Sequence, residues 1–239
     1  MPDSAHLLAM PLHAITEVHG EAGLRERFAL EIMRYEPEVR AKLEDALALA
    51  SELHRDDRRI REPYVNHLLR VAIRIVCYYH VDDLDVLTAA LLHDSVEDHP
   101  DELGGSTAQA LATLAERFGS RVARLVAAVT NPEYDPDRDT GEQYREHVAE
   151  SLDADPWARL IKVSDFTDNG VGVIHGTGPK LPHWAAKYQP LVPVLRELIA
   201  RPDTPLSAEV KVHISEQLDL AESRFAAILR SAPGEQGEP

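Results

Sequence analysis

The chain has 239 residues, of which 44% are hydrophobic and 5% aromatic, which suffices for one large domain or two small ones. Its net charge of −16, from 25 basic and 41 acidic residues, argues against a nucleic-acid binder, which needs a basic face. The single cysteine, Cys77, excludes a disulfide framework and a cysteine-based zinc site. No signal peptide and no apolar stretch long enough for a membrane span can be recognised, so we expect a cytoplasmic protein with no membrane partner.

Helical periodicity recurs along the whole chain, and two-residue alternation is absent over any useful length. We therefore expect one all-α domain over residues 24–230, after an N-terminal extension over residues 1–23 and before a disordered tail over residues 231–239. The glycine-rich segment 170–182 is expected to be an ordered loop or lid. The expected helices cover residues 24–54, 64–79, 106–118, 142–152, 155–169, 183–200 and 207–230, the first with a break near Pro37. Two more are expected, one from Asp82 or Asp83 through residue 98 and a short one ending at Val129.

The most informative segment covers residues 91–98, where an apolar helical run leads into His93, Asp94, Glu97 and Asp98. On one continuous helix these four side chains fall within about 140° of one face. One imidazole and three carboxylates at such density repel one another unless they share a cation or a proton. A solvated acidic helix end is the simpler interpretation of a lone His-Asp pair. The apolar residues that precede this pair indicate a buried helix, so we expect the cluster to line a cleft.

Two further segments carry side chains that complete such a cluster. His67 lies one turn into an expected helix, and Asp165 stands four residues before Asn169 on one helix face. Taken singly, His67 could be a core histidine and Asp165 a capping residue. Together with His93 and Asp94 they offer two imidazoles and two carboxylates, which suit manganese, iron or zinc better than magnesium.

The remaining charged groups fit hydrolysis of a phosphorylated substrate. Glu97 and Asp98 could orient an attacking water or protonate a leaving group. The arginines at positions 58, 59 and 61 could neutralise phosphate charge, although alone they would indicate a solvated loop.

Four stretches, in this order, resemble the HD superfamily of metal-dependent phosphohydrolases, and more closely the hydrolase domain of the RelA/SpoT family. Residues 58–67 resemble that family's R-K-S-G-E-P-Y-I-x-H, and residues 89–98 its A-A-L-L-H-D-x-V-E-D. Residues 118–126 resemble F-G-x-x-V-A-x-L-V, followed by Val-Thr at 129–130, and residues 160–169 resemble L-I-K-L-A-D-R-L-H-N. The resemblance covers roughly residues 45–170.

This resemblance implies a single HD-domain helical bundle that removes the 3′-pyrophosphate of a guanosine alarmone such as ppGpp with one Mn²⁺ per chain. The family's metal ligands correspond to His67, His93, Asp94 and Asp165, and its catalytic pair to Glu97 and Asp98. Its substrate contacts correspond to Arg58, Arg59, Lys162, Asn169 and, by a looser match, Tyr188. The family's synthetase domain has no counterpart in the sequence, so a stand-alone hydrolase similar to the small alarmone hydrolases is expected.

The chain departs from the family at Ile60-Arg61, at His99 in place of threonine, and at Phe166-Thr167-Asp168 in place of Arg-Leu-His. These differences leave the base preference open. Alternative substrates are an adenosine alarmone such as ppApp, a pyrophosphorylated tRNA end, or the phosphate of NADPH, and the protein could be an antitoxin to a small alarmone synthetase. Alternatives of another class are a non-catalytic nucleotide sensor and a helical interaction module. The sequence gives no indication of oligomeric state.

Overall fold

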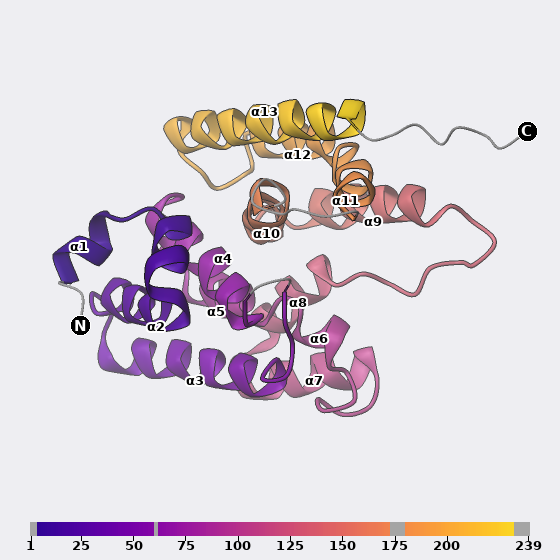
Figure 1. Ribbon diagram of the computed structural model, residues 1–239. Helices are drawn as coiled ribbons and strands as arrows, with labels where there is room; N and C mark the ends of the chain where they lie inside the picture. The colour runs from indigo at the N-terminus through magenta and orange to yellow at the C-terminus, as the bar shows by residue number, and fades with distance from the viewer. Residues whose placement is uncertain (1–3, 60–61, 173–179, 232–239) are drawn as a thin grey trace, which may run out of the picture.

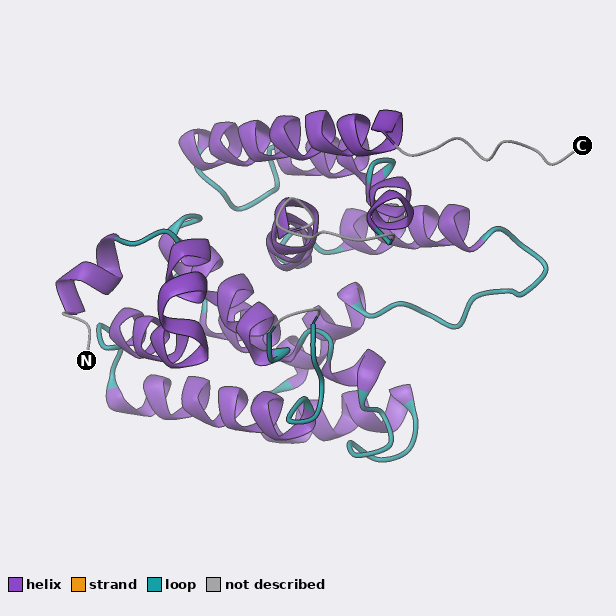
Figure 2. Ribbon diagram, viewed as in Figure 1, coloured by secondary structure: helices purple, strands orange, loops and turns teal. Residues whose placement is uncertain are grey.

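The computed structural model describes residues 4–59, 62–172 and 180–231. These residues form thirteen helices and no strand (Figure 1), which confirms the all-α class, and Figure 2 shows only loops between the helices. The helices are α1 (Ser4–Ala9), α2 (Leu12–Ile32), α3 (Pro37–Leu53), α4 (Val65–Cys77), α5 (Leu84–Leu92), α6 (Ser95–Asp98), α7 (Thr107–Phe118), α8 (Ser120–Val129), α9 (Thr140–Ala154), α10 (Ala158–Gly172), α11 (Leu181–Tyr188), α12 (Leu191–Ala200) and α13 (Ala208–Ser231).

Helix α10 lies at the centre of the arrangement. It packs against α4, α5 and α8 on one side and against α11, α12 and α13 on the other (Figure 1). Helices α4 and α5 are buried along almost their whole length; α5 is mostly apolar, whereas α4 also carries buried polar side chains, among them Asn66, His67 and Arg70. The polar groups that α4, α5 and α10 do carry are therefore held where water has little access.

Several expected helix boundaries are confirmed. Helices α2 and α3 are separated just before Pro37, which takes the first position of α3. Of the two candidate caps for α5, Asp83 is the one used, because its Oδ1 accepts hydrogen bonds from the backbone N–H groups of Asp85 and Val86 at 3.1 and 3.2 Å. The Ser106 Oγ accepts from Gln109 N–H at 3.3 Å and caps α7.

The first long helix begins earlier than expected. Helix α2 starts at Leu12 and crosses residues 23 and 24, where the sequence analysis divides an N-terminal extension from the domain. Gly20 and Gly23 interrupt the apolar pattern there, and the chain passes them with a bend at Gly20, whose φ is +60°. Leu7, Leu12 and Ile15 belong to the hydrophobic core. The division at residue 24 remains a prediction about domain organisation.

The helix expected to carry the His-Asp cluster is not continuous. Helix α5 ends at Leu92, and His93 and Asp94 form a turn before the short α6. Asp94 has φ −94° and ψ −9°, which lies toward the bridge region and departs from the angles of a regular helix. The four polar side chains therefore do not share one helix face as the sequence analysis assumed.

Two expectations for the C-terminal part also need correction. The helix expected over residues 183–200 is divided into α11 and α12 by Gln189 and Pro190, because proline lacks the N–H that a continuous helix would use. The expected loop over 170–182 begins later, since α10 continues to Gly172 and α11 starts at Leu181. A Cβ at Gly170 would lie 3.1 Å from the Phe225 ring, so this glycine allows α10 to approach α13 closely.

The rest of the expected loop, residues 173–179, and the tail after Ser231 lie outside the described residues. Among the helices that the structure describes, none is both long enough and apolar enough to cross a membrane.

Candidate metal centre and active site

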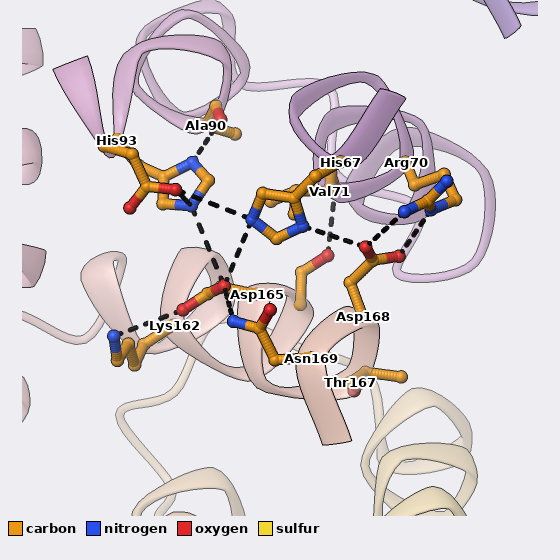
Figure 3. Close-up of polar contacts among 12 residues, drawn as sticks. His67, Arg70, Val71, Ala90, His93, Lys162, Asp165, Thr167, Asp168 and Asn169 are labelled. Atoms are coloured by element: carbon orange, nitrogen blue, oxygen red, sulfur yellow. Dashed lines mark hydrogen bonds and ion pairs between the residues drawn. The ribbon is translucent and has the colours of Figure 1, made fainter. Parts of the chain in front are cut away.

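Three helices bring the four sequence-predicted ligands together (Figure 3). His67 comes from α4, His93 and Asp94 from the turn after α5, and Asp165 from α10. The His67 Nε2 lies 3.6 Å from Asp94 Oδ2 and 3.3 Å from Asp165 Oδ1. The His93 Nε2 lies 3.0 Å and 3.8 Å from the same two oxygens. Residues almost a hundred positions apart thus place two nitrogens and two oxygens around one point.

Both inward-facing nitrogens lack a hydrogen bond within the described part of the chain, although both are buried. The His93 Nδ1 donates to the Ala90 carbonyl at 2.9 Å, and the His67 Nδ1 lies 2.8 Å from Asp168 Oδ2. In the neutral form of each ring these acceptors hold the proton on Nδ1, so Nε2, which faces Asp94 and Asp165, is the nitrogen that a metal ion would bind. Two orphaned imidazole lone pairs facing two carboxylates fit a divalent transition metal.

Electrostatics within the cluster shows how tightly these charges are coupled. Burial alone would lower the pKa of His93, but the carboxylates of Asp94 and Asp165 raise it to about 10. Burial would raise the pKa of Asp94, yet His93 and His67 hold it well below its usual range. Burial acts likewise on Asp165, whose pKa is held well below the usual range by Lys162 and both histidines. The carboxylates therefore stay ionised and available to a cation, and a metal ion that bound His93 would displace the proton from its Nε2.

Asp168 is a site residue that the sequence analysis recorded only as a departure from the family. Its carboxylate contacts His67 and forms a paired contact with Arg70, with Nε–Oδ1 and Nη2–Oδ2 distances of 2.9 Å each. Arg74 Nη2 lies 3.1 Å from Asp168 Oδ1. Asp168 therefore fixes the ring of His67 from behind, as a carboxylate behind a metal-binding histidine does. Its three-residue spacing from Asp165 on one helix was the signal that could have identified it.

Arg59, Asn169 and Lys162 meet the cluster at Asp165. Asn169 Nδ2 donates to Asp165 Oδ1 at 2.5 Å, and Arg59 Nη1 donates to Asn169 Oδ1 at 2.7 Å. Lys162 Nζ lies 3.2 Å from Asp165 Oδ2. Two cationic groups and an amide thus border the candidate metal site, where an anionic substrate would need them.

Tyr64, which was not predicted as a site residue, donates from its hydroxyl to Asp94 Oδ2 at 2.7 Å. The other predicted substrate residues lie farther out. Arg58 is exposed and pairs by a β-bridge with Pro63. The Tyr188 ring meets the Phe166 ring edge-on at 6.0 Å between centroids, next to Asp165 along α10.

The predicted catalytic pair divides into two different environments. The Glu97 oxygens accept from the Asn131 side-chain and backbone nitrogens at 2.9 and 3.0 Å, so Glu97 ties α6 to the segment after α8. Asp98 is exposed, but desolvation and then repulsion from Asp94 and Glu97 raise its pKa to about 6. A carboxyl that titrates near neutral pH is suited to proton transfer.

The chain is similar in sequence and in structure to several known proteins. A family model described as "HD domain" matches residues 46–154, which include His67, His93 and Asp94 but stop before Asp165. The chain is 35% identical over 128 residues to the mouse (Mus musculus) guanosine-3′,5′-bis(diphosphate) 3′-pyrophosphohydrolase MESH1. The matched stretch covers 52% of this chain and 65% of that protein. The chain is 33% identical over 132 residues to the Drosophila melanogaster protein of the same name, which is 54% of this chain and 68% of that one.

A longer relative from Aquifex aeolicus, also named guanosine-3′,5′-bis(diphosphate) 3′-pyrophosphohydrolase, is 33% identical over 152 residues, which cover 63% of this chain but 20% of that protein. A solved structure titled "A metazoan ortholog of SpoT hydrolyzes ppGpp and plays a role in starvation responses" matches with a TM-score of 0.58 and 26% identity, over 75% of this chain and 95% of that one. The chain thus spans from a fifth to about two thirds of these curated relatives.

Proposed function

Because the chain belongs to the HD-domain family that includes the MESH1 3′-pyrophosphohydrolases, we propose that it hydrolyses the 3′-pyrophosphate of guanosine alarmones. In this reaction ppGpp or pppGpp and water give GDP or GTP and pyrophosphate. The observation that carries the proposal is the pair of buried Nε2 atoms, on His67 and His93, that face two carboxylates without hydrogen bonds in the described residues. The proposal includes the cytoplasmic location expected from the sequence.

We propose that His67, His93, Asp94 and Asp165 hold one Mn²⁺, since mixed nitrogen and oxygen ligands favour manganese, iron or zinc over magnesium. When bound, such an ion supplies a Lewis acid at the phosphoryl group and lowers the pKa of water. The protein's own contribution is to hold the imidazoles rigidly, through the contacts of His93 with Ala90 and of His67 with Asp168.

The remaining residues would handle protons and charge. In hydrolysis a water oxygen bonds to the phosphorus as the bond from that phosphorus to the 3′ oxygen breaks, and the 3′ oxygen gains a proton. Asp98, with its pKa of about 6, would take a proton from the water or give one to the 3′ oxygen, and Glu97 would assist it. Arg58, Arg59 and Lys162 would bind phosphate oxygens, Asn169 the sugar and its phosphate, and Tyr188 another part of the substrate.

The direct test is pyrophosphate release, with Mn²⁺, from a panel of ppGpp, pppGpp and ppApp, together with phosphate release from NADPH. We expect release from the guanosine alarmones that EDTA abolishes. Preferential release from ppApp or NADPH would reassign the substrate. If the metal-loaded protein released nothing from any of them, a pyrophosphorylated tRNA end or a non-catalytic sensor would replace the proposal.

Two substitutions separate metal binding from chemistry. Asp94→Asn should abolish both turnover and tight Mn²⁺ binding, because it removes a charged ligand. Glu97→Gln should reduce turnover but leave the bound metal in place, because Glu97 contacts Asn131 and not the histidines. Metal content and turnover, measured on the same preparations, check both; an active, metal-replete D94N protein would overturn the ligand assignment.

A further inference from the structure

A second group of metal-competent side chains lies outside the site described above. His54 directly follows α3, Asp57 lies three residues farther along the chain, and His99 comes directly after α6. The His54 Nδ1 and the His99 Nε2 each lie 2.7 Å from the same oxygen, Asp57 Oδ2. The three potential ligand atoms all lie within 4.8 Å of one another. Two imidazole nitrogens and a carboxylate oxygen thus converge from three separate segments.

The surroundings of these side chains resemble those of a metal site more than those of a surface ion pair. The His54 side chain is fully buried, the His99 side chain is 14% exposed, and the Asp57 side chain is 36% exposed. One side is therefore held by protein, and the other admits an ion and water ligands. Two histidines and one carboxylate with open positions form a donor set used by zinc, iron and related divalent ions.

The two rings are also oriented in advance. The His99 Nδ1 lies 3.5 Å from Glu102 Oε1, so a carboxylate stands behind the nitrogen that faces away from Asp57, as is usual for metal-binding histidines. The His54 ring stacks on Tyr64 with centroids 4.7 Å apart and 14° between the planes. Its Nε2 is buried and has no hydrogen-bond partner among the described residues, so stacking on Tyr64 orients this ring, and Nε2 would carry the ring proton when Nδ1 binds a metal.

Tyr64 separates this group from the first site. Its ring stacks on His54 and meets His67 edge-on at 5.6 Å between centroids, while its hydroxyl bonds to Asp94. The two candidate sites therefore share a wall but no ligand. Removing a ligand from one leaves the donors of the other intact.

We propose that His54 Nδ1, Asp57 Oδ2 and His99 Nε2 form a second binding site for a divalent transition metal, with water completing the coordination. Tetrahedral bonds of about 2.0–2.1 Å would place neighbouring ligand atoms roughly 3.3 Å apart, so Asp57 must move outward by about half an ångström. Asp57 can do so because its side chain is partly exposed and lies outside the helices. This site is additional to the one Mn²⁺ of the proposed function.

The test counts metal equivalents on the full chain. Metal-free protein is dialysed against Co²⁺, the bound cobalt is measured by elemental analysis, and its visible absorption is recorded. We expect two equivalents for the unmodified protein and one for His99→Gln and for Asp57→Asn. The matched control is His6→Gln, which changes an exposed histidine of α1 and should retain two. Thermal unfolding followed by circular dichroism verifies that each variant is folded.

Asp165→Asn distinguishes failure of this site from failure of the first, because it removes a ligand of the first site only. If the unmodified protein bound only one equivalent, and D165N lost it while H99Q and D57N kept it, the second site would be overturned. If the unmodified protein bound only one equivalent, and H99Q and D57N lost it while D165N kept it, the result would support the second site and count against the first. Two equivalents that persist in both H99Q and D57N would likewise overturn the proposal and leave the triad as a set of hydrogen bonds.

Discussion

The Asp168 carboxylate determines which ring nitrogen of His67 faces the candidate metal site. This carboxylate lies between His67 and two arginines, and Arg70 is itself paired with Glu62 at 2.6 Å. Burial alone would raise the pKa of Asp168, but Arg70, His67 and Arg74 hold it well below its usual range. The ionised carboxylate keeps a proton on His67 Nδ1 and leaves Nε2 free for a metal. We therefore assign Asp168 as a positioning residue.

Asp168→Asn should weaken Mn²⁺ binding about 10–100-fold, because the neutral amide no longer fixes the orientation and basicity of His67. The variant should also be less stable by about 3 kcal/mol, since Arg70 and Arg74 lose a buried counter-charge. Isothermal titration with Mn²⁺, well below the melting temperature, measures the first effect separately from the second.

Asp203→Asn is the control for that experiment. Asp203 also pairs with a buried arginine, Arg159, at 2.8 Å, but remote from the histidines. Its loss should leave the Mn²⁺ affinity unchanged. Equal affinities in D168N and the unmodified protein would remove the positioning role from Asp168.

Asp98 gives a pH-dependent prediction for the metal-free protein. Its folded-state pKa of about 6 lies above the usual value, so between about pH 4 and pH 6 the folded state binds more protons than the unfolded state. Stability therefore falls as the pH rises through 6, because ionising Asp98 costs more free energy in the folded protein than in the unfolded chain. Asp98→Asn should raise the free energy of unfolding at pH 7.5 by about 1 kcal/mol, after allowance for solvent screening, and have little effect at pH 4.5.

Urea unfolding in EDTA at both pH values measures this difference. The same substitution should lower turnover at pH 7.5, where the proposed proton transfer needs a titratable group. An equal change in stability at the two pH values would show that Asp98 titrates as an ordinary surface carboxyl.

At the scale of elements, the turn between α5 and α6 determines which polar side chains enter the site. Apolar periodicity predicts α5 correctly, because Leu87 and Leu91 are fully buried, but it cannot reveal that the helix stops at Leu92. The break directs Asp94 toward His67 and lets Glu97 reach Asn131. The four-residue spacing of a continuous helix would have given a different cluster.

The cap of α5 should matter for stability in a way that its neighbour does not. Asp83→Ala removes the acceptor for two backbone N–H groups and the 2.6 Å contact with Arg121, so it should lower the free energy of unfolding by about 1–2 kcal/mol. Asp82→Ala, the matched control, removes only exposed contacts with Arg34 and Tyr35 and should cost at most about 0.5 kcal/mol. Chemical unfolding of both variants checks the assignment; similar losses would contradict it.

For the molecule as a whole, α10 lies between the two halves of the fold. It carries residues that motif resemblance could predict and one that it could not. Motif resemblance predicted roles for Asp165 and Asn169 on this helix, because both the spacing and the residue types resemble those of a known family. It could not identify Asp168, where this chain differs, or the contact of Tyr64 with Asp94, which arises only when α4 and the α5–α6 turn are packed together. Local patterns predicted most helices, whereas the bend at Gly20 and the division at Pro190 depend on backbone conformation that periodicity does not record.

The N-terminal segment provides the last prediction, because Leu7, Leu12 and Ile15 belong to the hydrophobic core. The Leu7 side chain is fully buried, and its carbonyl accepts a hydrogen bond of 2.5 Å from Arg27 Nη1 of α2. Leu7→Ala should lower the free energy of unfolding by about 2–3 kcal/mol, through lost burial and the cavity that remains. Leu8→Ala, in the same helix but 46% exposed, should change it by at most about 0.5 kcal/mol. A single cooperative urea transition with this difference between the two variants would mean that residues 1–23 fold with the domain, whereas equal, small effects would mean that they form a separable extension.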